Sequence, residues 1–492
     1  MVTPGTNELY VADPAAAEEI MRRCRDREFV QREMVYQVLD VFGPNVDSVN
    51  GKVWERHRRI TVPPFNERIS GCVWDEAGRQ AKGALEVWLA NSREETVRST
   101  QNDCMKIALH VLTRAGFGVS YDFSGEGKTV NRSGRHKLTY RDALRTLLDN
   151  MVIVFFLRIA QQGGWPLWAT WGRARKVLDA HAEFQDYMTE MMAEEKTRMQ
   201  SGEKDRGNLM SVLVRSSEQA KLSGKIADDG AAGRNTFQGL TDEEVYGNMF
   251  IYNLAGHDTT ANTIHIALTI LAIHPEWQVW VAEEIDRVVG TGEEHNRVYE
   301  DVFPKLPRCL ALMYETQRLY PSVPCLPRWT ADTWQQISVG GTEIMIPPQT
   351  NVMVNSTALQ THPKYWGPDP LVFRPDRWTV NAQEHQQDEI DADGPHDWQS
   401  TSLLQPVPGS FVAWSAGPRI CPGKKFSQVE FVSVIAMLFS NNSRVEVVRE
   451  KDEMPEDAKR RVARVLAEAK TEIALKVPNA ESIGMRWFRK VP

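Results

Sequence analysis

The chain has 492 residues, of which 42% are hydrophobic and 25% are charged, so it carries enough apolar side chains for a large buried core. Its 58 basic and 65 acidic residues give a formal net charge of −7, and this balance does not favour nucleic acid as a partner. The six cysteines are scattered without a C-x-x-C pair, which argues against a disulfide framework and against a zinc site.

Helical patterns dominate the first two thirds of the chain. The first predicted helix covers residues 14–25, with Asp13 as N-cap and Pro14 at the first helical position. The longest plainly apolar run, residues 151–157, is far shorter than the roughly 20 residues of a membrane-spanning helix. Apolar periodicity predicts further helices over residues 79–117 (interrupted near Asn91), 140–157, 173–200, 209–216, 241–274, 275–289 and 306–320.

The last third of the chain has a different residue pattern. Residues 336–354 alternate short apolar runs with glycine and proline, as strands and turns do. Residues 381–402 are acidic and rich in glutamine, which predicts a surface insertion. A last helix is predicted over 424–439, and terminal strands are predicted over 471–487. Helices followed by a small strand-rich part predict a mainly α (α+β) chain that forms a single domain over 1–492.

The most informative cysteine, Cys421, lies in the segment WSAGPRICPG at residues 414–423. Gly417 and Gly423 flank it and permit a tight turn that brings backbone N–H groups close to the sulfur. The helix that follows presents its positive end to the thiol, and Arg419 adds a cation. Such surroundings lower the pKa of a thiol from about 8.5, and the resulting thiolate can ligate iron. Cys421 is therefore a candidate metal ligand, and the alternative is a buried structural cysteine.

This spacing resembles the haem-binding signature F-x-x-G-x-R-x-C-x-G of the cytochrome P-450 superfamily. Trp414 stands where the family usually has phenylalanine, and its indole N–H can donate a hydrogen bond that alters the surroundings of the sulfur. The resemblance implies the cytochrome P-450 fold, with haem b (iron protoporphyrin IX) bound through Cys421. The style of residues 351–378 is similar to that of microsomal, fungal members.

A second set of residues resembles a structural motif of the family. Glu315 and Arg318 form an E-x-x-R pair on one helical face, which alone is weak evidence because such pairs are common. The segment from Phe373 to Trp378 is similar to the family's F-x-P-x-R-[FW] segment and contains Arg377. By this resemblance Glu315, Arg318 and Arg377 form a buried structural triad that holds the cysteine loop in place.

The long central helix contains the string AGHDTT from Ala255 onwards. A glycine inside a helix costs about 1 kcal/mol relative to alanine, and threonine hydroxyls can bend a helix, so one interpretation is a polar kink without function. The string also resembles the family's [AG]-G-x-[DE]-T-[TS] motif. That match implies that Thr259 and Asp258 deliver protons to dioxygen, while Ala255 leaves room for it. His257 falls at the variable position and is expected to face solvent or to be hydrogen-bonded.

Cations that resemble the family's propionate ligands are spread along the chain. Trp54 and Arg58 match its W-x-x-x-R helix, and Arg328 and Arg419 match two further arginines. Three cations around two carboxylates suit a buried dianion. A set of basic residues is expected on the cysteine side of the haem, either as a docking patch for an acidic electron donor or as solvated surface charge. These residues are Lys52, Arg56, Arg59, Lys424 and Lys425.

The resemblance breaks at the front of the chain. Only about fifty residues precede Trp54, so the family's membrane anchor, first strand and first helix are expected to be missing. The resemblance implies association with the endoplasmic reticulum membrane. The chain as written has no anchor, and it is expected to be soluble and to face the cytoplasm.

These observations predict a haem-thiolate monooxygenase that inserts one oxygen atom from O2 into a lipophilic small molecule such as a secondary metabolite. The resemblance implies NADPH-cytochrome reductase as the electron donor and a membrane surface as a further partner. The alternatives are a haem-thiolate isomerase or dehydratase, which the Asp258–Thr259 pair argues against, and an inactive haem-binding remnant. Residues expected to line the pocket, by position only, are Phe250, Asn253, Leu254, Ser322, Val323 and Ile483.

Overall fold

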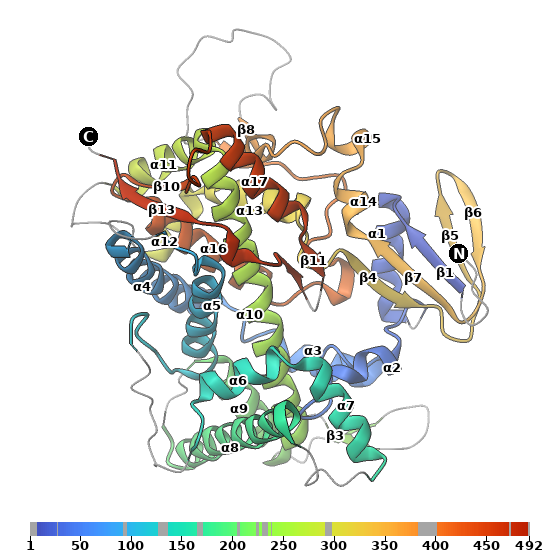
Figure 1. The fold of residues 1–492 in the computed structure, drawn as a ribbon. Helices are drawn as coiled ribbons and strands as arrows, with labels where there is room; N and C mark the ends of the chain where they lie inside the picture. The colour runs from blue at the N-terminus through green and yellow to red at the C-terminus, as the bar shows by residue number, and fades with distance from the viewer. Residues whose placement is uncertain are drawn as a thin grey trace. The chain divides into compact units, whose positions relative to one another are not determined.

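The computed structural model describes residues 7–26, 28–91, 96–125, 136–164, 171–203, 207–222, 226–228, 235–237, 239–290, 298–381, 401–471 and 474–490 (Figure 1). The chain divides into two compact units. Unit 1 consists of Met1–Val30, Ser70–Val111 and His257–Pro492, and unit 2 consists of Gln31–Ile69 and Leu112–Gly256.

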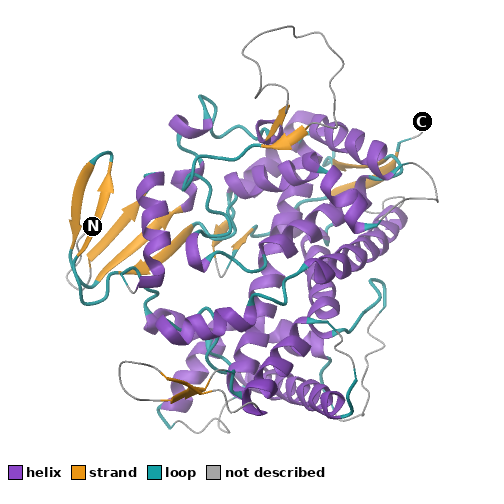
Figure 2. Ribbon diagram, turned by 180° about the vertical axis from the view of Figure 1, so that it is seen from behind, coloured by secondary structure: helices purple, strands orange, loops and turns teal. Residues whose placement is uncertain are grey.

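Unit 2 is mainly helical, as the colouring in Figure 2 shows. Its elements are α2 (Glu33–Tyr36), η2 (Gln37–Leu39), α3 (Gly51–Thr61), α6 (Tyr140–Leu148), α7 (Met151–Gln162), α8 (Gly172–Gln200), α9 (Leu209–Leu222), the strands β2 (Ile226–Asp228) and β3 (Asn235–Phe237), and the first half of α10 (Asp242–Ile273). The helix predicted over 173–200 is confirmed as α8, which buries Val177, Phe184 and Met188 on one face.

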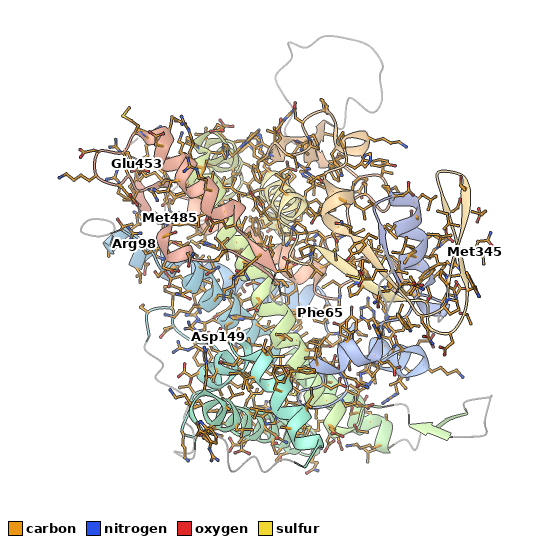
Figure 3. The ribbon with its side chains drawn as sticks, turned by 45° about the vertical axis from the view of Figure 1, so that its right-hand side comes forward. Phe65, Arg98, Asp149, Met345, Glu453 and Met485 are labelled. Atoms are coloured by element: carbon orange, nitrogen blue, oxygen red, sulfur yellow. The ribbon has the colours of Figure 1, made fainter. Side chains whose placement is uncertain are left out.

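The helix predicted over 140–157 is two helices, α6 and α7, because the chain breaks at Asp149 (labelled in Figure 3) and Asn150. The Asn150 side-chain amide donates to the carbonyl of Thr146 at 2.7 Å. Aspartate and asparagine compete for backbone hydrogen bonds in this way, so an apolar pattern alone does not reveal the break.

Unit 1 contains the other helices and most of the strands. Its helices are α1 (Pro14–Arg22), η1 (Arg23–Asp26), most of α4 (Glu67–Asn91) and α5 (Thr100–Phe117), the second half of α10, α11 (Pro275–Val289), α12 (Tyr299–Val302), η4 (Phe303–Lys305), α13 (Pro307–Leu319), α14 (Ser356–Gln360), α15 (Pro363–Trp366), η5 (Pro375–Trp378), η7 (Gly417–Arg419), α16 (Lys424–Phe439), α17 (Pro455–Ala467) and η8 (Ala480–Ser482). Its strands are β1 (Asn7–Val11), β4 (Cys325–Trp329), β5 (Gln335–Val339), β6 (Thr342–Ile346), β7 (Thr350–Asn355), β8 (Thr379–Asn381), β9 (Thr401–Leu403), β10 (Ser443–Val447), β11 (Lys470–Thr471), β12 (Leu475–Lys476) and β13 (Met485–Arg489).

The largest sheet of unit 1 has the strand order β1-β7-β4. β1 runs parallel to β7 with Val11 opposite Val354, and β4 runs antiparallel to β7 with Arg328 opposite Val352. Helix α1 buries Ile20 and belongs to the same apolar cluster as these strands. The sheet thus fixes the position of Arg328 on a buried central framework.

The ends of the predicted surface insertion over 381–402 are held by β8 and β9, which pair antiparallel with Asn381 opposite Thr401. The rest of the insertion lies outside the described residues.

The interior of unit 1 is built around α16, whose apolar residues are buried on every side. The helices predicted over 275–289 and 424–439 are confirmed to the residue as α11 and α16. None of the helices in the described part of the chain has both the length and the apolar character of a membrane-spanning segment.

Candidate active site

The loop that leads into α16 is closed by backbone hydrogen bonds. The N–H of Cys421 donates to the carbonyl of Trp414 at 2.9 Å, and the N–H of Ser415 donates to the carbonyl of Val412 at 2.8 Å. Gly417 has a φ of +63°, and a Cβ atom there would lie 2.4 Å from the carbonyl oxygen of Met21. Glycine is therefore required at residue 417 both for the turn and for the close approach of α1.

Cys421 is the exposed member of the six cysteines, and the other five are buried or half-buried. Gly423 is the N-cap of α16, and as a glycine it makes no side-chain hydrogen bond to the first turn of this helix. Its φ of −81° is open to any residue, but a Cβ atom there would lie 3.7 Å from the Cys421 sulfur. Gly423 thus lies in the turn that leads into α16, at ordinary contact distance from the sulfur.

A lysine side chain lies beside this sulfur. Burial lowers the pKa of Lys424, and the negative charge of Cys421 opposes that shift. A cation and the positive end of a helix both favour the thiolate over the thiol. Cys421 is therefore placed to act as an anionic sulfur ligand.

The sequence predicts that the indole N–H of Trp414 donates a hydrogen bond near the sulfur. Its acceptor lies in the first turn of α16. The indole donates to the Ser427 hydroxyl at 3.0 Å, and that hydroxyl donates to the carbonyl of Lys424 at 2.9 Å. The Lys424 ammonium also lies 5.5 Å from the centroid of the indole ring. Trp414 thus connects the cysteine loop to the first turn of α16. Ser427 gave no signal in the sequence.

Glu315, Arg318 and Arg377 meet in a buried network. Both carboxylate oxygens of Glu315 accept from Arg318 at 2.8 Å, and one of them also accepts from Arg377 at 3.1 Å. The Trp378 indole and the backbone N–H of Arg374 complete the set at 2.9 and 2.8 Å. A buried ion pair is tolerated only when its remaining hydrogen-bonding groups are satisfied, as they are here.

A buried glutamine joins this network to the cysteine loop. The carbonyl of Gln360 accepts from Arg318 at 2.8 Å, and its side-chain oxygen accepts from the N–H of Val412 at 3.0 Å. Gln360 is separated from both partners by more than forty residues, so the sequence gave no signal for it.

The AGHDTT segment lies in the middle of α10. Ala255 is exposed, Asp258 and Thr259 are half-buried, and the flanking residues of the helix are largely buried. Of the two alternatives predicted for His257, solvent exposure or a hydrogen bond, solvent exposure does not hold: the side chain is buried with Nδ1 2.9 Å from Oδ1 of Asp258. A Cβ atom at Gly256 would lie 3.3 Å from Leu112, so the residue also allows close helix packing.

Arg328 is buried on β4 of unit 1. Its Nε donates to the sulfur of Cys24 at 2.9 Å, and another guanidinium nitrogen donates to the carbonyl of Pro327 at 2.7 Å. Cys24 is a partner that the sequence did not reveal. Arg419 is half-buried at the end of η7, two residues before Cys421.

Trp54 and Arg58 lie on α3 of unit 2, where Trp54 is buried and Arg58 is half-buried. Arg56 on the same helix is not part of an open basic patch, because its guanidinium donates to both carboxylate oxygens of Glu244 at 2.7 and 2.6 Å. Burial alone would raise the pKa of Glu244, but hydrogen bonds from His57 and Arg56 hold it well below its ordinary value.

The residues expected to line a pocket differ in exposure. Phe250 and Asn253 have no exposed surface: Phe250 contacts the rings of Phe42 and Phe184, and Asn253 accepts from the Tyr140 hydroxyl at 3.2 Å. Both side chains pack within unit 2, and their place in a pocket stays a prediction. Leu254, Ser322 and Ile483 are buried, and Val323 is exposed.

The residues of unit 1 fit a haem held through sulfur. An exposed cysteine precedes a buried helix, and its loop is fixed by backbone hydrogen bonds. No cluster of three or more histidine, cysteine, aspartate or glutamate side chains suited to a metal ion occurs among the described residues. The loop of Cys421 therefore suits a sulfur ligand to haem iron.

Comparisons with known proteins agree with this assignment. The model of the cytochrome P450 family matches residues 3–474, so the chain belongs to the cytochrome P450 family. It is 30% identical to a cytochrome P450 monooxygenase of Arthrobotrys oligospora over 96% of this chain and 81% of that protein. It is 32% identical to a cytochrome P450 monooxygenase of Penicillium roqueforti over 89% of this chain and 73% of the other. The protein is accordingly a haem-dependent monooxygenase.

Solved structures confirm the mainly α fold. The haem domain of cytochrome P450DA superposes with a TM-score of 0.69 at 17% identity, covering 100% of this chain and 89% of that one. A zebra fish cytochrome P450 superposes with a TM-score of 0.67 at 18% identity, covering 100% of this chain and 96% of the other.

Proposed function

We propose that this monooxygenase inserts one atom of O2 into a lipophilic small molecule, with electrons from NADPH passed on by a reductase. The observation that carries the proposal is the exposed sulfur of Cys421 at the N-terminus of α16. The reaction balances as R–H + O2 + NADPH + H⁺ → R–OH + H2O + NADP⁺. The family match spans both units, which supports a single cytochrome P450 domain.

Cys421 holds the haem iron in this proposal, and the bound haem supplies the site at which O2 is activated. Arg58, Arg328 and Arg419 are the candidate cations for its propionates, suited to a buried dianion, and Trp54 is a further candidate contact. Glu315, Arg318 and Arg377 keep the cysteine loop in place, and their buried hydrogen-bonded network supports this role.

Proton delivery is assigned to Asp258 and Thr259. Both are half-buried on α10, so they can exchange protons with their surroundings while remaining fixed on a helix. The His257 ring lies beside this pair, with Nδ1 2.9 Å from the Asp258 carboxylate. Ala255 is exposed and small, which leaves room for O2 beside the helix.

The substrate class rests on the relatives. The chain is 31% identical to the phomenoic acid biosynthesis cluster cytochrome P450 monooxygenase of Leptosphaeria maculans, over 92% of this chain and 76% of that protein. We therefore propose a secondary metabolite as the substrate. Association with the surface of the endoplasmic reticulum membrane is supported by the spacing of Val152, Phe156 and Ile159, which are exposed apolar residues of α7.

The experiment is turnover of lipophilic candidate substrates by the haem-loaded chain with a fungal NADPH-cytochrome P450 reductase under ¹⁸O2. The expected product carries one ¹⁸O atom, and its formation requires NADPH, the reductase and Cys421. Conversion of a substrate without NADPH would instead indicate an isomerase or dehydratase. Absence of any turnover, together with failure to bind haem, would indicate an inactive remnant.

A further inference from the structure

A line of buried amide and hydroxyl side chains joins the AGHDTT segment of α10 to the loop of Cys421. Its members are Thr263 on α10, Gln317 on α13 and Gln360 on α14, and each is at most 4% exposed. All three belong to unit 1. Buried polar groups of this kind must be hydrogen-bonded, so their bonds allow few alternative arrangements.

The first part of the line fixes α10. The Thr263 hydroxyl donates to the carbonyl of Thr259 at 2.8 Å, and the Gln317 side-chain amide donates to the Thr263 hydroxyl at 2.7 Å. The neighbouring Asn262 amide donates to the carbonyl of Asp258 at 2.8 Å. Two consecutive side chains thus bond back to the carbonyls of the proton-delivery pair, and such bonds bend helices.

The second part of the line fixes the cysteine loop. The Gln360 side-chain amide donates to the carbonyl of Gln317 at 3.0 Å, while its side-chain oxygen accepts from the N–H of Val412 at 3.0 Å. Val412 in turn accepts from the N–H of Ser415. Gln317 therefore has its side chain bonded toward Thr259 and its backbone carbonyl bonded toward the loop of Cys421.

We propose that Gln317 is a positioning residue for oxygenation, which fixes the Asp258–Thr259 segment relative to the loop that carries Cys421. The inference rests on the proposed roles of Cys421, Asp258 and Thr259. It adds to them the residue that holds the Asp258–Thr259 segment and the Cys421 loop in a fixed relative position. Gln317 lies inside the Glu315–Arg318 motif, so the same turn of α13 supports both the structural triad and this connection.

A second buried glutamine provides a matched control. Gln278 on α11 is 2% exposed, donates to the carbonyls of Leu271 and Val445 at 2.6 and 2.7 Å, and accepts from the N–H of Val445 at 3.0 Å. It has the same chemistry and burial as Gln317, but it bonds to neither α13 nor the cysteine loop in the described structure. A purely structural role for Gln317 predicts that both glutamines respond to substitution in the same way.

The experiment compares haem-loaded Gln317→Met and Gln278→Met with the wild-type protein. Three quantities are measured: the Tm, the hydrogen peroxide released per NADPH in the presence of reductase without added substrate, and the infrared C–O stretch of the reduced carbon monoxide complex. We expect both variants to lower the Tm. Only Gln317→Met should raise the hydrogen peroxide released per NADPH, by roughly threefold to tenfold, because misplaced groups transfer protons poorly. Only this variant should also shift the C–O stretch.

Thr263 supplies an independent pair of variants that keep Gln317 in place. Thr263→Val removes the hydroxyl at nearly constant volume and should reproduce the peroxide and infrared changes, whereas Thr263→Ser retains the hydroxyl and should restore both. This pair decides the question if Gln317→Met does not fold. Equal peroxide shares and C–O stretches in Gln317→Met and Gln278→Met, or in the two Thr263 variants, would overturn the inference. Failure of the wild-type protein to bind carbon monoxide as a thiolate complex would instead overturn the proposed function.

Discussion

Two helices of unit 1, α13 and α16, begin next to a cysteine, and their N-termini are stabilised in different ways. At α13 the carboxylate of Glu284 accepts from the N–H groups of Arg308 at 2.9 Å and Cys309 at 3.1 Å. At α16 the N-cap is Gly423, which has no side chain to cap the first turn, and the exposed Cys421 lies just before it. A helix N-terminus favours an anion. At α13 the carboxyl group of Glu284 accepts from the first turn, whereas at α16 the exposed sulfur of Cys421 lies next to the N-cap.

The two cysteines differ accordingly. Burial, and then the negative charge of Glu284, raise the pKa of the Cys309 thiol well above its ordinary value. Cys421 is exposed and lies beside the Lys424 ammonium. Burial lowers the pKa of Lys424, and the negative charge of Cys421 acts in the opposite direction. Proximity to a helix N-terminus alone therefore does not make a cysteine a ligand. Exposure of the sulfur and the charge of its neighbours decide the outcome.

The largest expected effect is on thiol reactivity. In haem-depleted protein, iodoacetamide should modify Cys421 faster than Cys309 by on the order of a hundredfold, since each pKa unit changes the thiolate fraction tenfold. Peptide mass spectrometry after timed alkylation measures both rates. Haem loading should protect Cys421. Equal rates at the two cysteines would remove the basis of the comparison.

Removal of the carboxylate at α13 should cost stability. Glu284→Ala leaves the buried N–H groups of Arg308 and Cys309 without their acceptor, which should lower the free energy of unfolding by about 2–3 kcal/mol. Urea unfolding measures the change. The control is Glu456→Ala, because Glu456 and Lys459 form an exposed pair that should contribute at most about 0.5 kcal/mol. Similar losses in both variants would show that Glu284 is not a cap.

The same carboxylate should make stability depend on pH. Burial raises the pKa of Glu284 to about 7 from its ordinary 4.5, while hydrogen bonds from the backbone of Arg308 and Cys309 oppose the shift. Between these values the folded chain keeps a proton that the unfolded chain has released. The free energy of unfolding should therefore fall as pH rises, by at most about 1.4 kcal/mol per pH unit.

This pH dependence is measured as the difference between wild-type protein and Glu284→Gln in urea unfolding from about pH 5 to about pH 7. The glutamine variant should lose the slope that Glu284 contributes. Parallel pH profiles would mean that Glu284 is ionised throughout and caps α13 as a permanent anion.

The smallest expected effect concerns the bond between Trp414 and Ser427. Trp414→Phe removes the indole N–H and should lower the free energy of unfolding by about 1 kcal/mol. Ser427→Ala should have a similar effect, and the double variant should lose less than the sum because both changes break one bond. Strict additivity in this cycle would show that the indole is not held by Ser427.

Local signals predicted a large part of this molecule from its sequence. Pro275 at the first helical position and Gly290 after the last helical residue predicted the bounds of α11. The spacing around Cys421 located the candidate ligand before α16. The start of α4 at Glu67, twelve residues before the predicted position, was missed because Gly71 and Gly78 weaken the helical pattern there.

Long-range partners could not be predicted. Gln360 meets Val412 across 52 residues, Arg328 meets Cys24 across 304, and Arg56 meets Glu244 across 188. Each of these bonds is set by packing between elements, and single residues such as a buried glutamine have no periodicity that would reveal them. The sequence therefore located Cys421 and the triad, while the connections between them became visible only in the fold.

The most direct test of the central claim is the reduced, carbon monoxide-bound difference spectrum of the haem-loaded chain, measured beside Cys421→Ala and Cys309→Ala. The account predicts the strongly red-shifted Soret band of a thiolate-ligated haem in the wild-type protein and in Cys309→Ala, and its loss in Cys421→Ala. Persistence of the band in Cys421→Ala, or its absence from haem-loaded wild-type protein, would contradict the assignment of Cys421 as the ligand.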